Sequence, residues 1–243
     1  LKGEISNTIV WNPFYRSRFY VGTQSGRLIA CQIVDQKEEQ SQVAEKDSAD
    51  AKSKNKVIIQ VDLKFSFPIN FISIDPQTGT TLAVASHSDN KFSVVNNILT
   101  AKNTDQNEVY LFPGKNEKIV SLSFFPGQVS FLLIATANKL ILFSVTQRTA
   151  IPFITTDNIR FISMQSDGII IGSNNSVSLW KFQNGGQQSL TTNTEESQSN
   201  ITGWSKTSQI TFNSMQSKIP EASLYTELEN KIVIITESNW ITE

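Results

Sequence analysis

The sequence predicts an all-β protein in which one unit of antiparallel strands is repeated, and three observations support this prediction. First, residues 5–34, 69–95, 118–145 and 158–182 share one order of apolar strand, turn, apolar strand, polar turn and apolar strand. Second, a proline marks the first turn in three of these repeats. Third, the spacing of those turns is regular, which is typical of repeat folds. Such folds are platforms, so the pattern predicts an architecture and leaves the function open.

The repeats align at the turn between their first two strands. Pro13, Pro76 and Pro126 occupy this turn, and residues 164–168 (MQSDG) are its fourth version. Proline suits the end of a strand because it restricts φ and has no N–H to donate to a sheet. The intervals are roughly 63, 50 and 40 residues, and removing a loop of about 20 from the first leaves the spacing of a four-stranded β-propeller blade.

Residues 36–56 are the loop that lengthens the first interval. The segment QKEEQSQVAEKDSADAKSKNK contains no aromatic residue and almost no apolar one, so it buries too little surface to offset the entropy of ordering it. We expect a solvated, disordered-like insertion there. Residues 57–65 (VIIQVDLKF) then return as the outer strand of the first blade, and residues 1–182 hold four blades.

The chain becomes less regular after the fourth repeat. Residues 183–200 (QNGGQQSLTTNTEESQSN) are predicted to be a polar linker or loop. Beyond it, the sequence predicts a short strand at 210–212, a short helix at 220–230 with proline in its first turn, and a buried strand at 231–236. We interpret residues 201–243 as an incomplete or divergent fifth blade.

Composition narrows the class of protein. The chain has 243 residues, with 21 lysines and arginines against 22 aspartates and glutamates, so no bulk charge favours nucleic acid or an anionic membrane. One cysteine, Cys31, cannot form an internal disulfide, and no Cys/His spacing typical of zinc sites occurs. We therefore expect an intracellular protein of a reducing compartment, the cytoplasm or the nucleus, with no metal and no cofactor.

No membrane-targeting signal is visible in the sequence. It contains no apolar run of eighteen residues and no basic-then-apolar leader, so neither a membrane span nor a signal peptide is predicted. Because the first residue is Leu1 and not methionine, we expect the chain to be part of a longer protein.

Two lines of sequence resemble the WD-repeat family of β-propellers. They are residues 20–33 (YVGTQSGRLIACQI) and 169–182 (IIIGSNNSVSLWKF), which are similar to that family's strand, Gly-Ser/Thr, polar turn and tryptophan-ending strand. Trp180 stands at the family's tryptophan position, whereas the other repeats have an apolar residue there. The glycine-histidine pair that precedes a typical blade is missing, since His87 is the only histidine.

The resemblance implies a ring of four-stranded antiparallel blades. Seven blades of about 42 residues need nearly 300 residues, so this chain would form a partial or incomplete ring. Either further blades lie outside it, or another chain completes the open propeller in trans. One line, NPFYRSRFYVGTQSGRL at residues 12–28, also resembles the repeats of dynein intermediate chains.

The sequence contains no recognisable catalytic site. His87 lies in the turn ASHSDN without a nearby cysteine or a nucleophile elbow. Cys31 follows apolar strand residues and is predicted to be a core thiol. Gly114-Lys115 lacks the other residues of a phosphate-binding loop. We therefore predict that the protein is not an enzyme, although an enzyme with a site in the central channel remains an alternative.

The sequence is most consistent with a non-enzymatic scaffold that binds other protein subunits in a multiprotein assembly. Residues 12–20 combine arginines with aromatic residues, as protein interfaces and single-stranded nucleic-acid platforms do. The turns between second and third strands are expected to share one rim. A nucleic-acid-binding propeller is the alternative, which the overall charge does not favour. The candidate partner-binding residues are Tyr15, Arg16, Arg18, Gln24, Ser25, Asp89, Asn90, Asn138, Asn174 and Asn175.

Overall fold

The structure is a computed structural model that describes residues 3–35, 55–101, 109–111, 117–125, 128–155, 158–164, 168–173, 176–182, 204–211, 233–235 and 240–242. All regular structure in these residues is β-strand. The chain divides into two compact units, Leu1–Lys115 and Asn116–Glu243. Most of the predicted insertion, the linker at 183–200 and the predicted helix at 220–230 lie outside the described residues.

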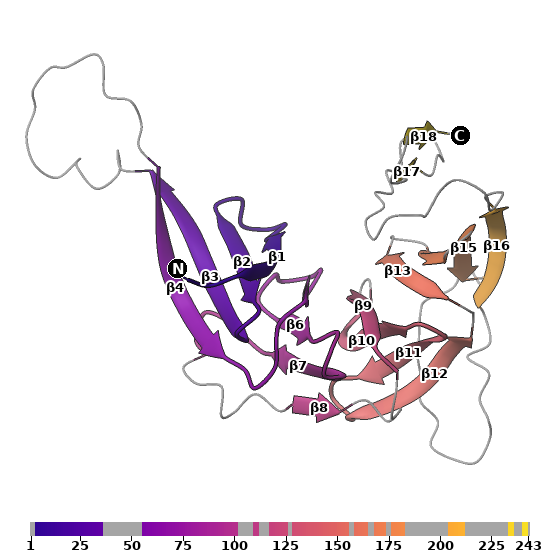
Figure 1. Cartoon of the computed structure of the whole chain (residues 1–243), viewed down its shortest axis with the longest axis horizontal. Helices are drawn as coiled ribbons and strands as arrows, with labels where there is room; N and C mark the ends of the chain where they lie inside the picture. Colours follow the sequence, from indigo (N-terminus) through magenta and orange to yellow (C-terminus); the bar gives the residue numbers. More distant parts are fainter. Residues whose placement is uncertain are drawn as a thin grey trace, which may run out of the picture. The chain divides into compact units, whose positions relative to one another are not determined.

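The first unit contains two four-stranded antiparallel sheets, each a simple meander (Figure 1). The first sheet consists of β1 (Ser6–Trp11), β2 (Arg18–Thr23), β3 (Arg27–Asp35) and β4 (Asn55–Lys64). The second sheet consists of β5 (Phe71–Ile74), β6 (Leu82–Ala85), β7 (Lys91–Val95) and β8 (Val109–Leu111). The prediction that the chain returns after the insertion as the outer strand of the first blade is confirmed, because β4 pairs with β3.

An Asx-Pro sequence makes the same turn after the first strand of each of these sheets. Asn12 is buried, and its Oδ1 accepts the backbone N–H of Phe14 and of Tyr15, at 2.9 and 3.2 Å. Asp75 is buried at the matching place, and its carboxylate accepts the N–H groups two and three residues further on. Because Asx side chains satisfy turn backbone in this way, the WNP and IDP motifs end their strands by the same mechanism.

The core of the first unit lies between its two sheets. One face of the first sheet contributes Tyr20, Leu28, Ala30 and Leu63, and the second sheet contributes residues such as Leu82. Strand alternation places these side chains on one face, because β2 and β3 residues that are paired in register point the same way. Burial of this face therefore joins the two sheets into one compact unit.

The second unit repeats this plan. Its third sheet has the order β12-β11-β10-β9 and its fourth the order β13-β14-β15-β16. Its core includes Leu133 and Leu140 from the third sheet and Ile169 and Ile171 from the fourth. The bounds are β9 Ile119–Phe125, β10 Gln128–Thr136, β11 Lys139–Ser144, β12 Thr149–Thr155, β13 Ile159–Met164, β14 Gly168–Ser173, β15 Ser176–Phe182, β16 Trp204–Thr211, β17 Val233–Ile235 and β18 Trp240–Thr242.

One strand belongs to a different sheet from the one predicted. The sequence predicts a fifth blade in residues 201–243, with a short strand at 210–212. In the structure β16 spans Trp204–Thr211 and pairs with β15 as the fourth strand of the fourth sheet. Its central residues 206–209 are exposed, so the strand lacks the apolar alternation that would have revealed it. The two short strands β17 and β18 pair only with each other.

The predicted fold class is confirmed. The described chain is all-β, and its four large sheets are the four-stranded antiparallel blades that the repeats predict. Each blade keeps its strands in chain order, so every hairpin connects neighbouring strands.

Candidate interaction surface

The turn between β1 and β2 presents aromatic and basic side chains. Phe14 and Tyr15 are both exposed, at 47 and 44%, and Arg16 is exposed as well. Arg18 is half-buried, and its guanidinium carbon lies 4.6 Å from the centre of the Tyr15 ring. This cation–π contact holds the predicted residues Tyr15 and Arg18 together. Arg16 beside them remains at the surface.

The turn between second and third strands has a hydroxyl in the same place in all four blades. Thr23 Oγ1 accepts the N–H of Arg27 at 2.9 Å, and Ser86 Oγ accepts the N–H of Asp89 at 3.2 Å. In the second unit Thr136 and Ser173 instead donate to a carbonyl three residues further on. The Ser/Thr hydroxyl at this position thus stabilises each turn by a hydrogen bond to its backbone.

Most of the described turn residues that follow these hydroxyls lie at the surface. Gln24, Ser25, Asp89 and Asn138 are exposed, whereas Asn90 is half-buried with a φ of 53°. Asn90 therefore has a backbone role, because few residues other than glycine and asparagine adopt this left-handed conformation. Asn174 and Asn175 lie outside the described residues.

The predicted residues of the first sheet fall into two groups. Tyr15, Arg16 and Arg18 lie at the β1–β2 turn, and Gln24 and Ser25 lie at the β2–β3 turn. Successive turns of a meander lie at opposite ends of the strand they share. The structure therefore does not bring these two groups together.

Sequence reasoning missed a surface that the structure reveals on the first sheet. We define the outer face as the side of this sheet that points away from the core of the first unit. Cys31 pairs with Phe19 and with Ile59, and Phe19 pairs with Trp11, so these four side chains share that side. The apolar residues of the outer face are Ile9, Trp11, Phe19, Val21, Ile29, Cys31, Ile33, Val57 and Ile59.

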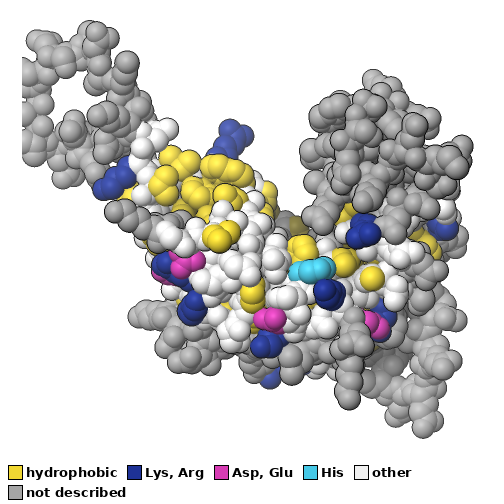
Figure 2. Space-filling view, viewed as in Figure 1, with side chains coloured by type: hydrophobic (Ala, Val, Ile, Leu, Met, Phe, Trp, Pro, Cys, Tyr) yellow, Lys and Arg dark blue, Asp and Glu magenta, His cyan; other side chains and the backbone are white. Residues whose placement is uncertain are grey.

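The outer face combines a buried floor with exposed apolar side chains. Val21, Ile29 and Cys31 form a small buried cluster against which Phe19 packs, and the Trp11 and Phe19 ring centres are 5.1 Å apart. Around this floor, four side chains are exposed by half or more: Ile9 by 57%, Trp11 by 54%, Val57 by 55% and Ile59 by 50%. Figure 2 shows the resulting concentration of hydrophobic side chains over the first sheet.

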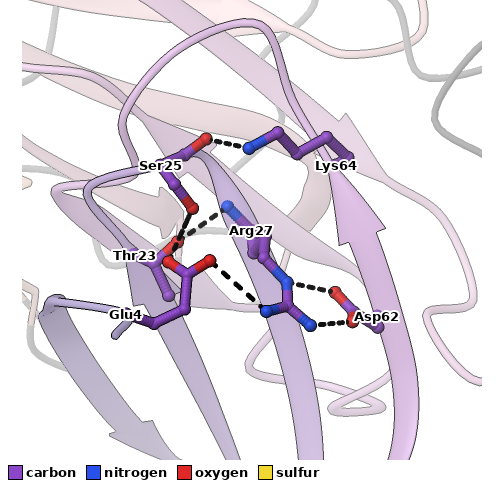
Figure 3. Close-up of polar contacts among 6 residues, drawn as sticks. All are labelled: Glu4, Thr23, Ser25, Arg27, Asp62 and Lys64. Carbon is purple, nitrogen blue, oxygen red and sulfur yellow. Dashed lines mark hydrogen bonds and ion pairs between the residues drawn. The ribbon is translucent and has the colours of Figure 1, made fainter. Parts of the chain in front are cut away.

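The end of the outer face nearest the β2–β3 turn is polar (Figure 3). Arg27 pairs with both carboxylate oxygens of Asp62, and its Nη1 lies 3.3 Å from Glu4 Oε1. Ser25 donates to Glu4 Oε2 at 2.7 Å, and Lys64 donates to the Ser25 carbonyl. The hydrogen bond from Ser25, with help from Arg27, lowers the pKa of Glu4 below its usual 4.5. The hydrogen bond to Asp62 and, to a smaller extent, the one to Glu4 raise the pKa of Arg27.

A sequence signal for the outer face exists but is ambiguous. Residues 28–31 of β3 (LIAC) are apolar without alternation, which indicates a strand that can be buried on both sides. The same pattern occurs in β6 and β10. Nothing in the local sequence shows which of these strands lies in a sheet with one face exposed.

Cys31 and His87 have structural surroundings. Cys31 is 2% exposed, and its burial raises the pKa of the thiol, which favours the neutral, unreactive form. The prediction of a core thiol is confirmed. His87 is exposed at the β6–β7 turn, where its ring packs edge-on against Phe71 at 6.4 Å. Its backbone N–H donates to Asn70 Oδ1.

The described residues contain neither a cluster of metal-ligating side chains nor a candidate membrane-spanning helix. Within these ranges no three His, Cys, Asp or Glu side chains gather as metal ligands would. Nor does the described part of the chain contain a helix that is long and apolar enough to cross a membrane. Gly114 and Lys115 lie outside the described residues.

The chain is similar to known proteins at the level of the fold. No family model matches the chain, and no curated protein matches it. Among solved structures, the chain is similar to the crystal structure of RRP9 WD40 repeats, with 13% sequence identity and a TM-score of 0.49. The match covers 74% of this chain and 49% of the other, so this chain spans about half of that structure's length. It gives no support to the one-line resemblance to dynein intermediate chains.

Proposed function

We propose that this chain is a non-enzymatic scaffold, a β-propeller part of a larger multiprotein assembly that binds other protein subunits. The strand cores hold the sheets rigid, while exposed turns and one exposed sheet face make the contacts. Rigid sheets that carry exposed contact residues are suited to binding because little side-chain or backbone order has to be created on association.

The distribution of exposed apolar residues is the observation that supports this proposal. Eight large hydrophobic side chains are exposed among the residues whose side chains the structure describes, and seven of them belong to the first sheet, its β1–β2 turn or the residue that precedes β1. Scattered exposed apolar residues are ordinary, but a concentration of this kind is typical of interaction sites. The seven are Ile5, Ile9, Trp11, Phe14, Tyr15, Val57 and Ile59.

Two finer statements belong to the same proposal. The exposed turn residues Tyr15, Arg16, Gln24, Asp89 and Asn138 extend the binding surface, and a partner chain completes an open propeller in trans. We place the assembly in the cytoplasm or nucleus, which fits a buried, unpaired Cys31. The net charge of −1 favours protein over nucleic acid as the partner.

The test is cross-linking of the full-length protein in extract from its native source, followed by purification and mass spectrometry. We expect the same few protein subunits to be recovered with the chain at constant ratio, also after mild washing without cross-linker. Recovery of the protein alone and as a monomer under gentle conditions contradicts the proposal.

A further inference from the structure

We propose that the outer face of the first sheet is the docking site for a β-sheet of another protein, which stacks on it face to face through an apolar surface. This inference deepens the proposed scaffold function and rests on it. It names the surface, the partner's local structure and the partner's chemistry.

The two faces of the first sheet differ in how far they are covered. The inner face is covered by the second sheet, and its residues Tyr20, Leu28 and Ala30 are fully buried. The outer face has the same alternation of aromatic and β-branched side chains, yet Trp11 and Ile59 are exposed by half or more. In both units, the described apolar face of a four-stranded sheet is covered by another four-stranded sheet. A pleated sheet surface accepts a second pleated surface about 10 Å away.

The outer face is small compared with the interface of a stable dimer. Four strands spaced about 4.8 Å apart, over about five residues each of about 3.3 Å, give a patch of about 300 Å². A stable protein dimer buries about 800 Å² on each partner. Two copies of this chain that met only through this patch would therefore form a weak dimer. A partner of different sequence can add contacts to the bordering Phe14-Tyr15 turn, so the patch favours a heterologous partner over a second copy.

The polar end of the outer face carries no net charge. It contains two carboxylates, Glu4 and Asp62, and two cations, Arg27 and Lys64, which balance. Arg27 already pairs with both Glu4 and Asp62, and Lys64 binds the Ser25 carbonyl. A strongly charged partner gains little from an end that is neutral and internally satisfied. The expected occupant has an apolar sheet face bordered by neutral polar side chains.

The experiment places a photoreactive benzoylphenylalanine at single positions of the full-length protein in cells or extract of its native source. Ile9, Trp11 and Ile59 are replaced on the outer face, one in each variant. Ser208, exposed in β16 of the fourth sheet, is the matched control. After irradiation, the cross-linked peptides are sequenced by mass spectrometry, so that the contacted residue of the partner is read directly.

We expect the three outer-face positions to cross-link to one protein, at apolar residues two apart in its strands, and the Ser208 control to give none of these products. Four outcomes overturn the proposal: no cross-link from the outer face, the same products from the Ser208 position, a second copy or another part of this polypeptide as the target, and target residues at the three- and four-residue spacing of a helix.

A substitution adds a second readout. In the double variant Ile9→Lys and Ile59→Lys, both side chains start at the surface, so we expect the thermal midpoint to stay within a few degrees of wild type. The yield of the partner should fall at least about tenfold, as removal of central apolar contacts does at interfaces. An unchanged yield with a folded variant overturns the outer-face proposal. If other subunits are still recovered, the scaffold function stands while this surface fails.

Discussion

At the scale of single residues, Asn12 shows how one buried polar side chain organises a turn and a contact between sheets. Its Oδ1 accepts two backbone N–H groups of the β1–β2 turn, and its Nδ2 donates to the Gly79 carbonyl at 2.8 Å and to the Tyr20 hydroxyl at 3.1 Å. Asp75, the matching residue of the second sheet, supplies only acceptors. Asn12 therefore links the first sheet to the second, in addition to shaping its own turn.

The substitution Asn12→Ala tests this role. It leaves two turn N–H groups without their buried acceptor, and the Gly79 carbonyl keeps only the Tyr20 hydroxyl at 3.5 Å, so we expect the free energy of unfolding to fall by about 2 to 4 kcal/mol. Urea unfolding followed by circular dichroism measures the change. Asn55→Ala, at an exposed strand end, is the control and should change stability by less than about 0.5 kcal/mol. Equal effects of the two substitutions would contradict the assigned role.

At the scale of elements, the hairpin turns are the most constrained parts of the blades. Gly26 ends the β2–β3 turn with a φ of 87°, and a Cβ there would lie 2.5 Å from the Phe67 carbonyl oxygen. Asn90 holds the corresponding place before β7 with a φ of 53°. Both turns need a left-handed residue, and at Gly26 an added Cβ would also meet backbone.

Paired substitutions separate these two constraints. Gly26→Ala should lower the free energy of unfolding by about 2 kcal/mol or more, because it adds both left-handed strain and a collision with backbone. Asn90→Gly should change it by less than about 1 kcal/mol, because glycine adopts the same conformation easily. Thermal unfolding of both variants measures this difference. A tolerated Gly26→Ala would show that the turn can rearrange.

The polar end of the first sheet predicts a pH dependence. The pKa of Glu4 is lowered in the folded protein, so the folded state favours the carboxylate. Its contribution to stability is present above the usual pKa of 4.5 and is lost as pH falls through the lowered folded value. Between pH 7 and pH 3, the urea midpoint of the wild type should fall further than that of Glu4→Gln, which has no titratable group at position 4. Identical pH profiles would contradict this assignment.

At the scale of the whole molecule, two compact units have separate cores. The core of the first unit joins its two sheets through residues such as Leu82, and the core of the second joins the third and fourth sheets through residues such as Ile169. Both side chains are fully buried. In repeat architectures, stability is close to a sum of local terms, so each unit should respond to changes in its own core.

Truncation of one core tests whether the units are energetically separate. Leu82→Ala should destabilise by about 2 to 5 kcal/mol through lost burial and a cavity. Hydrogen exchange read by mass spectrometry should accelerate in β1–β7, with smaller changes in β9–β15. Ile169→Ala is the reciprocal variant and should accelerate the second unit. Equal acceleration throughout the chain in both variants would show that the two units unfold together.

Much of the fold could be predicted because strand alternation and turn residues are local signals. The return of β4 after a polar insertion followed from its apolar residues, and the shared WNP and IDP turns followed from the proline that ends each strand. β16 was misplaced because its exposed residues lack alternation, and because pairing with β15 is a contact over a long polar segment that no local pattern records. Gln24, Ser25, Asp89 and Asn138, which the sequence offered as partner-binding residues, are exposed, and their binding role stays a prediction.

The sequence by itself determined that this chain is built of repeated four-stranded blades, because period-two alternation and turn-forming residues act within a few neighbouring positions. Only the tertiary structure decided which apolar strand face is covered. In β3, the side chains of Leu28 and Ala30 are buried against the second sheet. Ile29 and Cys31 lie on the opposite face, where the neighbouring side chains of Trp11 and Ile59 are exposed. These residue types look alike in the sequence. Their different surroundings depend on which sheet packs beside them, and that is a property of contacts between distant segments.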